Sequence, residues 1–360
     1  MTTPAKAPVM VKARSSGRRA RTWQRAFSLV ELMVALAIAS ILLGALAVMF
    51  VNMSNARNDI DRTSRQVESG RYAMQILSDE IRHAGYYGVL ANAPSLGASV
   101  TALPDACDTS TAGVQAAIGL PLQAYAGATS AANLDAPKLA CINAAAGYKP
   151  GTAVLVVRRI STAPPGALTA GSFNLQTSGC PGDLVRYVLD TSSNAGNFIL
   201  HTNTSPGCFP ITTAPVAPIS PYFTRIFFIS TCSDADCSVE GANNVPTLKR
   251  MDINPGAVSA PVALVDGIEN MQFDFGIDTT APGNGSPDVY KNMPLTLAEW
   301  QNVMTAHIYL LARNLDPSSG FTDTKSYALG PVPVGAPNDS YRRHVYTQLV
   351  RLYNPSQRRE

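Results

Sequence analysis

The sequence lacks the short motifs on which most enzymes depend. It contains no nucleophile elbow, P-loop, HExxH pair or dinucleotide-binding fingerprint. No two cysteines form a CxxC pair, and the histidines are scattered, whereas a zinc site requires closely spaced ligands. The four histidines are His83, His201, His307 and His344. These absences predict a protein that is not an enzyme and that carries no cofactor.

Charged side chains are few and unevenly distributed. They make up 15% of the 360 residues, with 28 basic and 25 acidic side chains. Seven of the basic residues lie within residues 1–26, which contain no acid, so the rest of the chain holds 21 basic and 25 acidic side chains. This mildly acidic remainder lacks the basic surplus that phosphate contacts require, which argues against nucleic acid as a partner. The seven cations are Lys6, Lys12, Arg14, Arg18, Arg19, Arg21 and Arg25.

A long apolar run follows these cations, in "RAFSLVELMVALAIASILLGALAVMF" (residues 25–50). From Phe27 to Met53 the only formal charge is Glu31, and 27 helical residues extend about 40 Å, enough to span a bilayer. The upstream cations place the N-terminus in the cytoplasm. A secretory signal peptide or simple signal anchor is the alternative, but a cleaved signal has a shorter apolar core and is cut after it. Here the small residue Ala26 precedes the apolar run.

The carboxylate of Glu31 requires a partner, because an isolated acid near the end of a membrane helix costs a few kcal/mol if it faces lipid. Cleavage between Ala26 and Phe27 would create such a partner, the free α-amino group of Phe27. The amine lies about one helical turn from Glu31 in its own chain. In an assembly of parallel helices it could also come from a neighbouring subunit.

The segment "FSLVELMVALAIASILLGAL" resembles the N-terminus of type IV pilins and of type II secretion pseudopilins. The resemblance implies that prepilin peptidase removes a basic leader, residues 1–26, by cutting between Ala26 and Phe27. It further implies that Phe27 becomes N-methylated and that Glu31 assists docking of the subunit into the filament. Two features depart from the family pattern: Ala26 replaces the usual Gly before the cut, and the leader is long, although a start at Met10 would shorten it.

The helical pattern continues past Met53 without proline to residue 88. Apolar residues recur at spacings of three, four and seven, which predicts one apolar stripe along an amphipathic helix. Gly70 is a weak point in this pattern, and Gly85 with Gly88 marks its end. We therefore expect residues 27–53 to form the membrane or filament-core half of one helix and residues 54–88 its amphipathic half. The stripe consists of Ile60, Val67, Met74, Leu77, Ile81 and Ala84.

The segment "ESGRYAMQILSDEIRHAGYYG" and several later blocks resemble the PilW-type minor pilins, with a weak resemblance over residues 91–149. The resemblance and the strand patterns together predict an α+β, pilin-like fold, in which the long helix packs on a mainly antiparallel sheet. Residues 89–360 would form the head, with 91–149 as a loop-rich insertion. "LTLAEWQNV" (295–303) predicts a short helix with Thr296 as its N-cap. Strands are expected at 152–160, 183–189, 197–201, 223–230, 262–266, 271–277, 305–313 and 344–352.

The six cysteines all lie beyond residue 100. An even number in a chain that crosses a membrane favours disulfides in an oxidising compartment over free buried thiols. Six cysteines allow 15 connectivities, so pairing by order along the chain is a guess. That order would give Cys107–Cys141, Cys180–Cys208 and Cys232–Cys237.

Several charged residues could have either a functional or a purely structural role. Asp79 and Glu80 are expected on the exposed side of the helix as solvated charge, and His83 as a surface or head-packing residue near the helix C-terminus. Four arginines near strand ends provide only weak grounds for a basic contact patch: Arg158, Arg159, Arg342 and Arg343.

The loop "DTTAPGNGSPD" (278–288) is a weak candidate for calcium. Asp278, Asn284, Ser286 and Asp288 offer oxygen ligands there, but Ca²⁺ usually requires more carboxylates, and an exposed turn is the alternative. No metal is therefore expected.

The sequence thus predicts a minor pilin that takes part in type IV pilus assembly, in a priming or tip complex. The alternatives are a pilus-tip adhesin, whose loops at 91–149 would bind a surface, and a minor pseudopilin of type II secretion. The expected partners are other minor and major pilins, prepilin peptidase, the inner-membrane assembly platform and, before assembly, the membrane. The expected location is the inner membrane, crossed once, with the head in the periplasm and later in the extracellular pilus.

Overall fold

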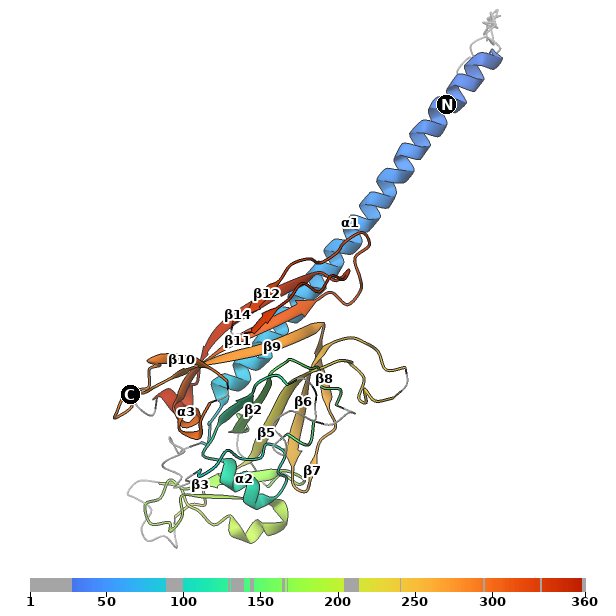
Figure 1. Cartoon of the computed structure of the whole chain (residues 1–360). Helices are drawn as coiled ribbons and strands as arrows, with labels where there is room; N and C mark the ends of the chain where they lie inside the picture. Colours follow the sequence, from blue (N-terminus) through green and yellow to red (C-terminus); the bar gives the residue numbers. More distant parts are fainter. Residues whose placement is uncertain are drawn as a thin grey trace, which may run out of the picture. The chain divides into compact units, whose positions relative to one another are not determined.

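The computed structural model describes residues 28–88, 100–128, 130, 139–142, 146–163, 166, 168–203, 214–239, 241–293, 295–330 and 332–357. The chain forms two compact units that divide between Arg57 and Asn58. One helix, α1 (Leu29–His83), contributes to both units, and all the described strands belong to the second unit (Figure 1).

The ends of α1 have local causes. At its start, Ser28 Oγ accepts a hydrogen bond from the backbone N–H of Val30 at 3.2 Å. At its end, Gly85 has φ 72° and Gly88 has φ 76°, a left-handed conformation that interrupts a helix at little cost only in glycine. The predicted helix and its glycine stop are confirmed.

An eight-stranded antiparallel sheet forms one layer of the second unit. Its central strand, β5 (Ile219–Ser230), pairs with β2 (Val154–Ile160), β3 (Phe173–Thr177) and β6 (Thr247–Asn254). The remaining strands are β1 (Leu122–Tyr125) beside β2, β4 (Tyr187–Thr191) beside β3, and β7 (Ala257–Val258) and β8 (Val262–Asp266) beside β6.

A second antiparallel sheet has the order β10–β9–β11–β14. Its strands are β10 (Val289–Asn292), β9 (Ile268–Ile277), β11 (Val303–Arg313) and β14 (Arg343–Arg351). The hairpin of β12 (Tyr327–Leu329) and β13 (Val332–Val334) is separate. The short helices are α2 (Thr111–Ala117), α3 (Leu297–Gln301), α4 (Tyr353–Gln357) and the 3-10 turn η3 (Ser192–Asn197).

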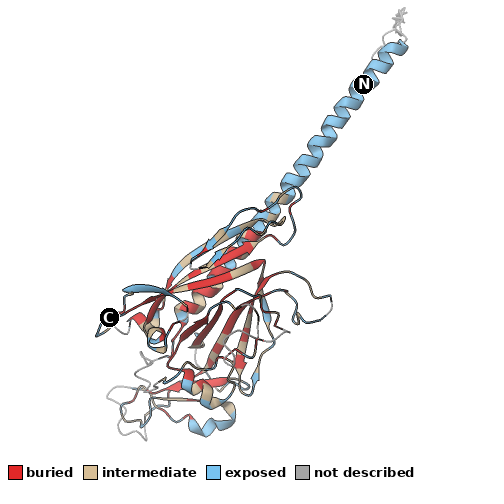
Figure 2. Cartoon of the chain, in the orientation of Figure 1, coloured by how far each residue is buried: buried red, intermediate tan, exposed pale blue. Residues whose placement is uncertain are grey.

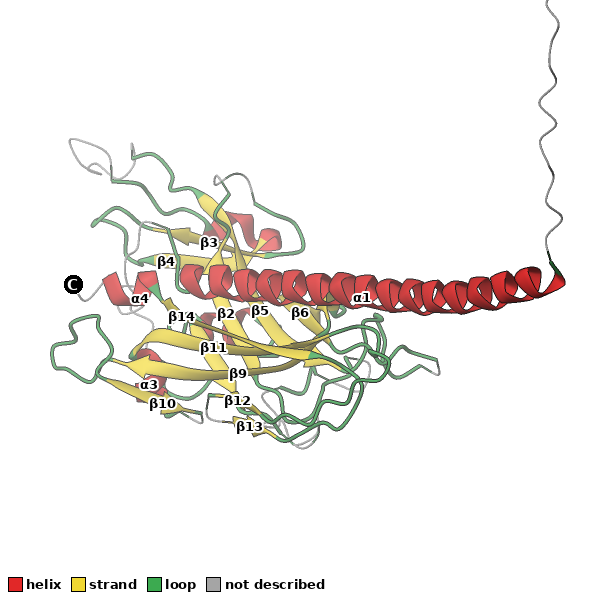
Figure 3. Ribbon diagram, turned by 90° about the horizontal axis from the view of Figure 1, so that it is seen from above, coloured by secondary structure: helices red, strands yellow, loops and turns green. Residues whose placement is uncertain are grey.

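The core of the second unit lies where the last turns of α1 meet both sheets (Figure 3). Leu77 and Ile81 of α1 are fully buried in one cluster with Phe227 of β5, Phe273 of β9 and Ile308 of β11. A second cluster lies around other side chains of β2 and β5, among them Val156 and Phe228. Burial concentrates along these strands and the end of α1 (Figure 2), so the predicted α+β fold is confirmed.

Most strand predictions overlap an observed strand, and the helix at Leu297–Gln301 has the expected N-cap. Thr296 accepts from the N–H of Glu299, whose carboxylate accepts from the N–H of Thr296, which completes a capping box. The predicted strand at 197–201 is wrong, because this segment follows η3 and makes only an isolated bridge between His201 and Val216. Strands that the sequence patterns did not predict are β1, β3, β6, β7, β10, β12 and β13.

The described part of residues 91–149 is more than a loop-rich insertion. Helix α2 begins with Ser110, whose side chain accepts from Gly113 N–H, and β1 pairs in register with β2 from Leu122↔Val157 to Tyr125↔Val154. The expectation of long loops is therefore wrong for α2 and β1, which are part of the fold.

Two disulfides join described cysteines, Cys107–Cys141 and Cys232–Cys237. These are two of the pairs that the order along the chain predicts. Cys180 is also disulfide-bonded, and its expected partner, Cys208, lies outside the described residues. The Cys107–Cys141 bond joins the segment after β1 to the loop before α2.

Gly70 has a packing role that the sequence did not reveal. A Cβ atom at this position would lie 2.2 Å from Cε2 of Tyr346, on β14. The missing side chain lets the Tyr346 ring approach the helix backbone, so Gly70 is a close contact between α1 and the second sheet.

We expect Gly70→Ala to lower the free energy of unfolding of the head by about 1–3 kcal/mol, because the new methyl group overpacks this contact. Helix propensity alone predicts the opposite sign, a gain of about 1 kcal/mol. Denaturant unfolding of the full-length chain in detergent measures the difference. Gly44→Ala, where the added Cβ has open space, should leave head stability unchanged. In a Tyr346→Ala background the Gly70→Ala penalty should shrink; an undiminished penalty would contradict the proposed contact.

Candidate assembly interface

The first part of α1 presents an apolar surface that nothing in the described chain covers. Residues 28–58 are all classed as exposed, and the large apolar side chains from Leu29 to Met53 are 48–74% exposed. Among the described residues, α1 is the one helix with the length and apolar composition of a membrane span. Exposed apolar area costs about 25 cal/mol per Å² in water, so this surface requires lipid or a protein partner.

Glu31 lies in the first turn of α1, next to the end of the helix where backbone N–H groups are unpaired. Its side chain is exposed, and no ion pair with another described residue is present. A carboxylate in this turn interacts favourably with the helix dipole, but that alone does not neutralise it in an apolar environment. Ala26 and Phe27, the predicted cleavage residues, lie outside the described residues.

The later turns of α1 are fixed to the second sheet by polar side chains as well as by the apolar stripe. Gln66 is buried, and its Nε2 donates to the carbonyls of Ala312 at 2.8 Å and Arg342 at 2.9 Å. Three turns further on, Ser78 Oγ donates to Oε1 of Gln348 on β14 at 2.9 Å. These contacts satisfy polar groups that would otherwise be costly to bury at the interface of helix and sheet.

Glu80 joins α1 to the first sheet. Its carboxylate accepts two hydrogen bonds of 2.9 Å from Arg159 on β2 and another from Arg225 on β5. The Glu80 side chain is only 12% exposed, so the expectation of a solvated charge is wrong for this residue. Burial raises the pKa of Glu80, but the hydrogen bond from Arg159 and the charges of Arg225 and Arg159 outweigh burial, so the pKa lies below its usual value.

The neighbouring charged residues agree better with the sequence interpretation. The Asp79 side chain is 50% exposed and makes a distant ion pair of 3.5 Å with Arg82. His83 is exposed in the last turn of α1, where Nδ1 lies 2.6 Å from the carbonyl oxygen of Asp79.

The four arginines do not form a basic patch. Arg158 is fully buried and donates to the carbonyl of Leu120 and to Gln123, whereas Arg159 pairs with Glu80. The Arg343 side chain is 1% exposed, and its guanidinium pairs with Glu269, Asp323 and Asp339. Arg342 is the most exposed, with an ion pair of 3.4 Å to Asp59. These four arginines therefore make contacts within the chain and do not gather into a shared basic patch.

The calcium candidates lie in a turn, and their side-chain oxygens accept hydrogen bonds from donors in the same turn. Asp278 accepts from Thr280 and from Gly285 N–H, and Asp288 accepts from the backbone N–H and hydroxyl of Thr279. Asn284 Oδ1 accepts from the N–H of Ser286. Within the described parts of the chain, no cluster of three or more His, Cys, Asp or Glu side chains could hold a metal ion. The arrangement favours an ordinary turn.

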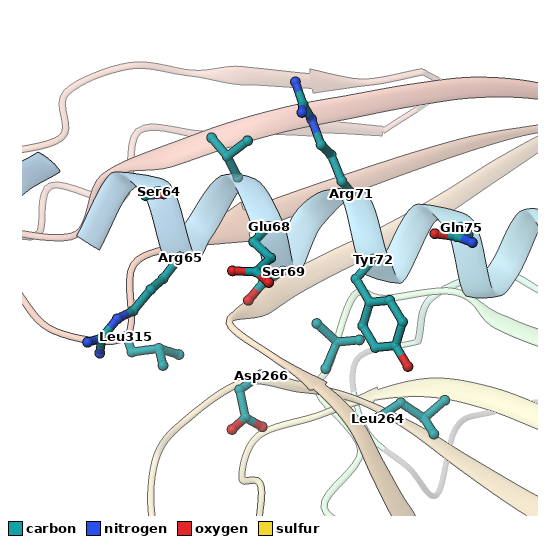
Figure 4. A pocket seen from close by; sticks show the side chains of 12 residues that line it. Ser64, Arg65, Glu68, Ser69, Arg71, Tyr72, Gln75, Leu264, Asp266 and Leu315 are labelled. Carbon is teal, nitrogen blue, oxygen red and sulfur yellow. The ribbon is translucent and has the colours of Figure 1, made fainter. Parts of the chain in front are cut away.

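A groove of about 870 Å³ lies beside α1 in the second unit (Figure 4). It runs along residues 64–75 of the helix and is bounded on the other side by Leu264 and Asp266 of β8 and by Leu315. Ile60 is 67% exposed, so the predicted stripe does not pack against the head at that position, whereas Val67 is partly buried beside the groove. Met74, Leu77, Ile81 and Ala84 are buried as predicted.

Comparison with known families supports the resemblance seen in the sequence. A family model described as "Type IV Pilus-assembly protein W" matches residues 226–354, from β5 to the start of α4. Another, described as "Prokaryotic N-terminal methylation motif", matches residues 24–47, which include Ala26, Phe27 and Glu31. No curated protein matches the chain.

One solved structure that matches is the type IV-like pilin TTHA1219 from Thermus thermophilus, at 12% sequence identity. The match covers 81% of this chain and 97% of that chain, with a TM-score of 0.34. A TM-score this low adds no support to the two family matches.

We expect Glu80→Gln to lower the free energy of unfolding at neutral pH by about 3 kcal/mol, because Arg159 and Arg225 would lose their anionic partner. Since the folded-state pKa of Glu80 is lowered, its contribution is fully present above the usual value of 4.5 and is lost as pH falls through the folded-state value. The gap between wild type and variant should therefore narrow below about pH 4.5. Denaturant unfolding of both proteins at a series of pH values measures this difference in the free energy of unfolding.

Glu68→Gln is the matched control, since Glu68 lies on the same helix with an exposed side chain. It should change stability by less than about 0.5 kcal/mol. A Glu80→Gln effect as small as that of Glu68→Gln, or one that does not vary with pH, would contradict the role of Glu80.

Proposed function

We propose, on the strength of the two family matches, that this chain is a type IV pilus minor pilin of the PilW family and that it enters the assembly as a mature subunit beginning at Phe27. Prepilin peptidase cuts between Ala26 and Phe27, and Phe27 is N-methylated. Residues 27–53 then form the membrane and filament-core half of the helix, residues 54–88 its amphipathic half, and residues 89–360 the head.

The observation that carries this proposal is the uncovered apolar surface of α1 from Leu29 to Met53. In the membrane this surface faces lipid, and in the filament it packs against the helices of other subunits. The same surface therefore serves both the stored and the assembled state. The two environments differ in what they offer to Glu31, because the hydrocarbon interior of a bilayer provides no cation from another molecule.

Glu31 lowers the free energy of the assembled state relative to that of the subunit in lipid. A carboxylate within an apolar helix costs a few kcal/mol in lipid, and a neighbouring amine in a parallel bundle removes that cost by forming an ion pair. The α-amino group of Phe27 is created only by leader cleavage, so docking becomes favourable only for mature subunits. We assign Glu31 this docking role.

The charge asymmetry and the disulfides support the proposed topology. Seven cations and no acids precede the apolar run, an asymmetry that favours a cytoplasmic N-terminus. Disulfides in the head require an oxidising compartment, as the periplasm is. The head therefore folds in the periplasm, where it meets other minor and major pilins and the inner-membrane assembly platform, before it reaches the extracellular pilus.

The size of the head supports a position in a priming or tip complex. Two sheets and their loops occupy the unit from Asn58 to Glu360, a large volume to repeat at every position of a filament. The adhesin alternative cannot be examined by deleting residues 91–149, because that deletion removes β1 from the first sheet and exposes Arg158.

We expect Glu31→Gln to insert into the membrane normally but to enter pili on the order of tenfold less than wild type, the effect of about 1.4 kcal/mol of lost ion pairing. Quantitative immunoblotting of membrane and sheared-pilus fractions measures both amounts. Ser40→Ala, which changes a polar side chain on the same helix, should assemble normally. Normal incorporation of Glu31→Gln would remove the docking role.

We further expect the N-terminal peptide of the assembled protein to begin with N-methyl-Phe27. Mass spectrometry of pilus-associated protein measures its mass. An intact Arg25–Ala26–Phe27 peptide in assembled material would contradict the proposed maturation.

A further inference from the structure

A fully buried lysine lies against a disulfide in the head. Lys249, on β6, has 0% exposure, and its ammonium group donates to the carbonyl of Asp234 at 2.5 Å. The same Nζ lies 3.3 Å from Sγ of Cys237 and 3.8 Å from Sγ of Cys232. Within the described residues it forms no salt bridge with a carboxylate, although the charges of Asp234, Asp236 and Asp266 act on it from a greater distance. Burial lowers the pKa of Lys249 more than these three carboxylates raise it, so the oxidised site holds a cation that is only partly compensated.

The disulfide itself is placed to react. Cys232 is 2% exposed, whereas Cys237 is partly exposed, so a reagent from solution reaches Cys237 first. Ser230 Oγ lies 3.1 Å from Cys237 Sγ, but its hydroxyl donates to the carbonyl of Ala146 at 2.8 Å. The Lys249 ammonium is therefore the charged donor that faces both sulfurs.

We propose that Cys232–Cys237 is a redox modification site at which a dithiol reductant exchanges with the disulfide and Lys249 stabilises the thiolate that forms. A thiolate of the reductant attacks Cys237 Sγ, the S–S bond breaks, and its electron pair passes to Cys232 Sγ beside Lys249. The second thiol of the reductant loses its proton and attacks the mixed disulfide, which releases Cys237.

Atoms and electrons balance in this exchange. The protein disulfide gains two electrons, and the reductant leaves as a disulfide. One of its two protons is retained by one cysteine of the pair and the other passes to solvent, because the second cysteine remains a thiolate paired with Lys249.

Electrostatics favours this direction of exchange. A disulfide is neutral and accepts hydrogen bonds weakly, whereas a thiolate is an anion that forms an ion pair with the buried ammonium. The ion pair exists only after reduction, so it shifts the equilibrium towards the dithiol. Cys107–Cys141 provides an internal comparison, since the group that donates to Cys107 Sγ is the neutral backbone N–H of Cys141, at 3.1 Å.

The test equilibrates the full-length chain in detergent with graded ratios of reduced to oxidised dithiothreitol, followed by alkylation and mass spectrometry of the cysteine peptides. Lys249→Met should require at least a tenfold higher ratio than wild type to reduce Cys232–Cys237 by half, and the Cys107–Cys141 bond should be unaffected. Lys149→Met is the matched control, because Lys149 is an internal lysine that pairs with Glu269 at 3.1 Å. An unchanged midpoint in Lys249→Met would overturn the proposal.

A second measurement uses the wild-type protein alone and so does not depend on the folding of a variant. After reduction, the rate of iodoacetamide alkylation at Cys232 and Cys237 is followed against pH. One of the two should react as a thiolate well below the ordinary thiol pKa of about 8.5. If both titrate at or above that value, Lys249 does not stabilise a thiolate and the proposal fails.

Discussion

The structure depends on one constraint: a single helix backbone must bind a folded head along one part of its length and leave another part uncovered for a partner. Contacts along several turns hold residues 58–83 of α1 in place, and three of them show how varied they are. Gln66 donates to two carbonyls at the end of the second sheet, Gly70 admits the ring of Tyr346, and Glu80 bridges Arg159 and Arg225 of the first sheet. Because Gln66 and Glu80 are separated by about 21 Å of helix, the attachment extends over several turns.

Several charged side chains of the head are buried and have their partners inside it. Arg158, Lys249 and Arg343 are cations with buried side chains, and each meets a different partner: carbonyl and amide oxygens, disulfide sulfurs, and carboxylates. A buried cation is tolerated when its donors are satisfied, and removal of one partner leaves an uncompensated charge. The low content of charged residues therefore does not reflect a simple apolar core. It reflects a head in which several charges connect strands and helix.

Local patterns in the sequence predicted much of the fold, and their failures have physical causes. Strands β9, β11 and β14 were predictable because each is a long, apolar or alternating segment with strong β propensity. Strand β6 was missed because "TLKRMDIN" carries three charged residues, of which Lys249 and Arg250 have internal partners. The segment 197–201 appeared to be a strand because it is apolar, but it lacks a neighbouring strand over most of its length. Whether β6 and the segment 197–201 form strands depends on pairing with partners that are distant in the sequence.

The sequence by itself determined the features that depend on order and spacing along the chain. These are the apolar run with its single acid at Glu31, the length of α1 with its stop at Gly85, and the capping of α3 by Thr296. Tertiary structure alone decided that Glu80 is an ion-pair partner, that Gly70 is a contact point and that Lys249 faces a disulfide. The reason is that a repeat pattern specifies which face of an element is apolar. The neighbour of each side chain on that face comes from elements far along the chain, and only folding brings them together.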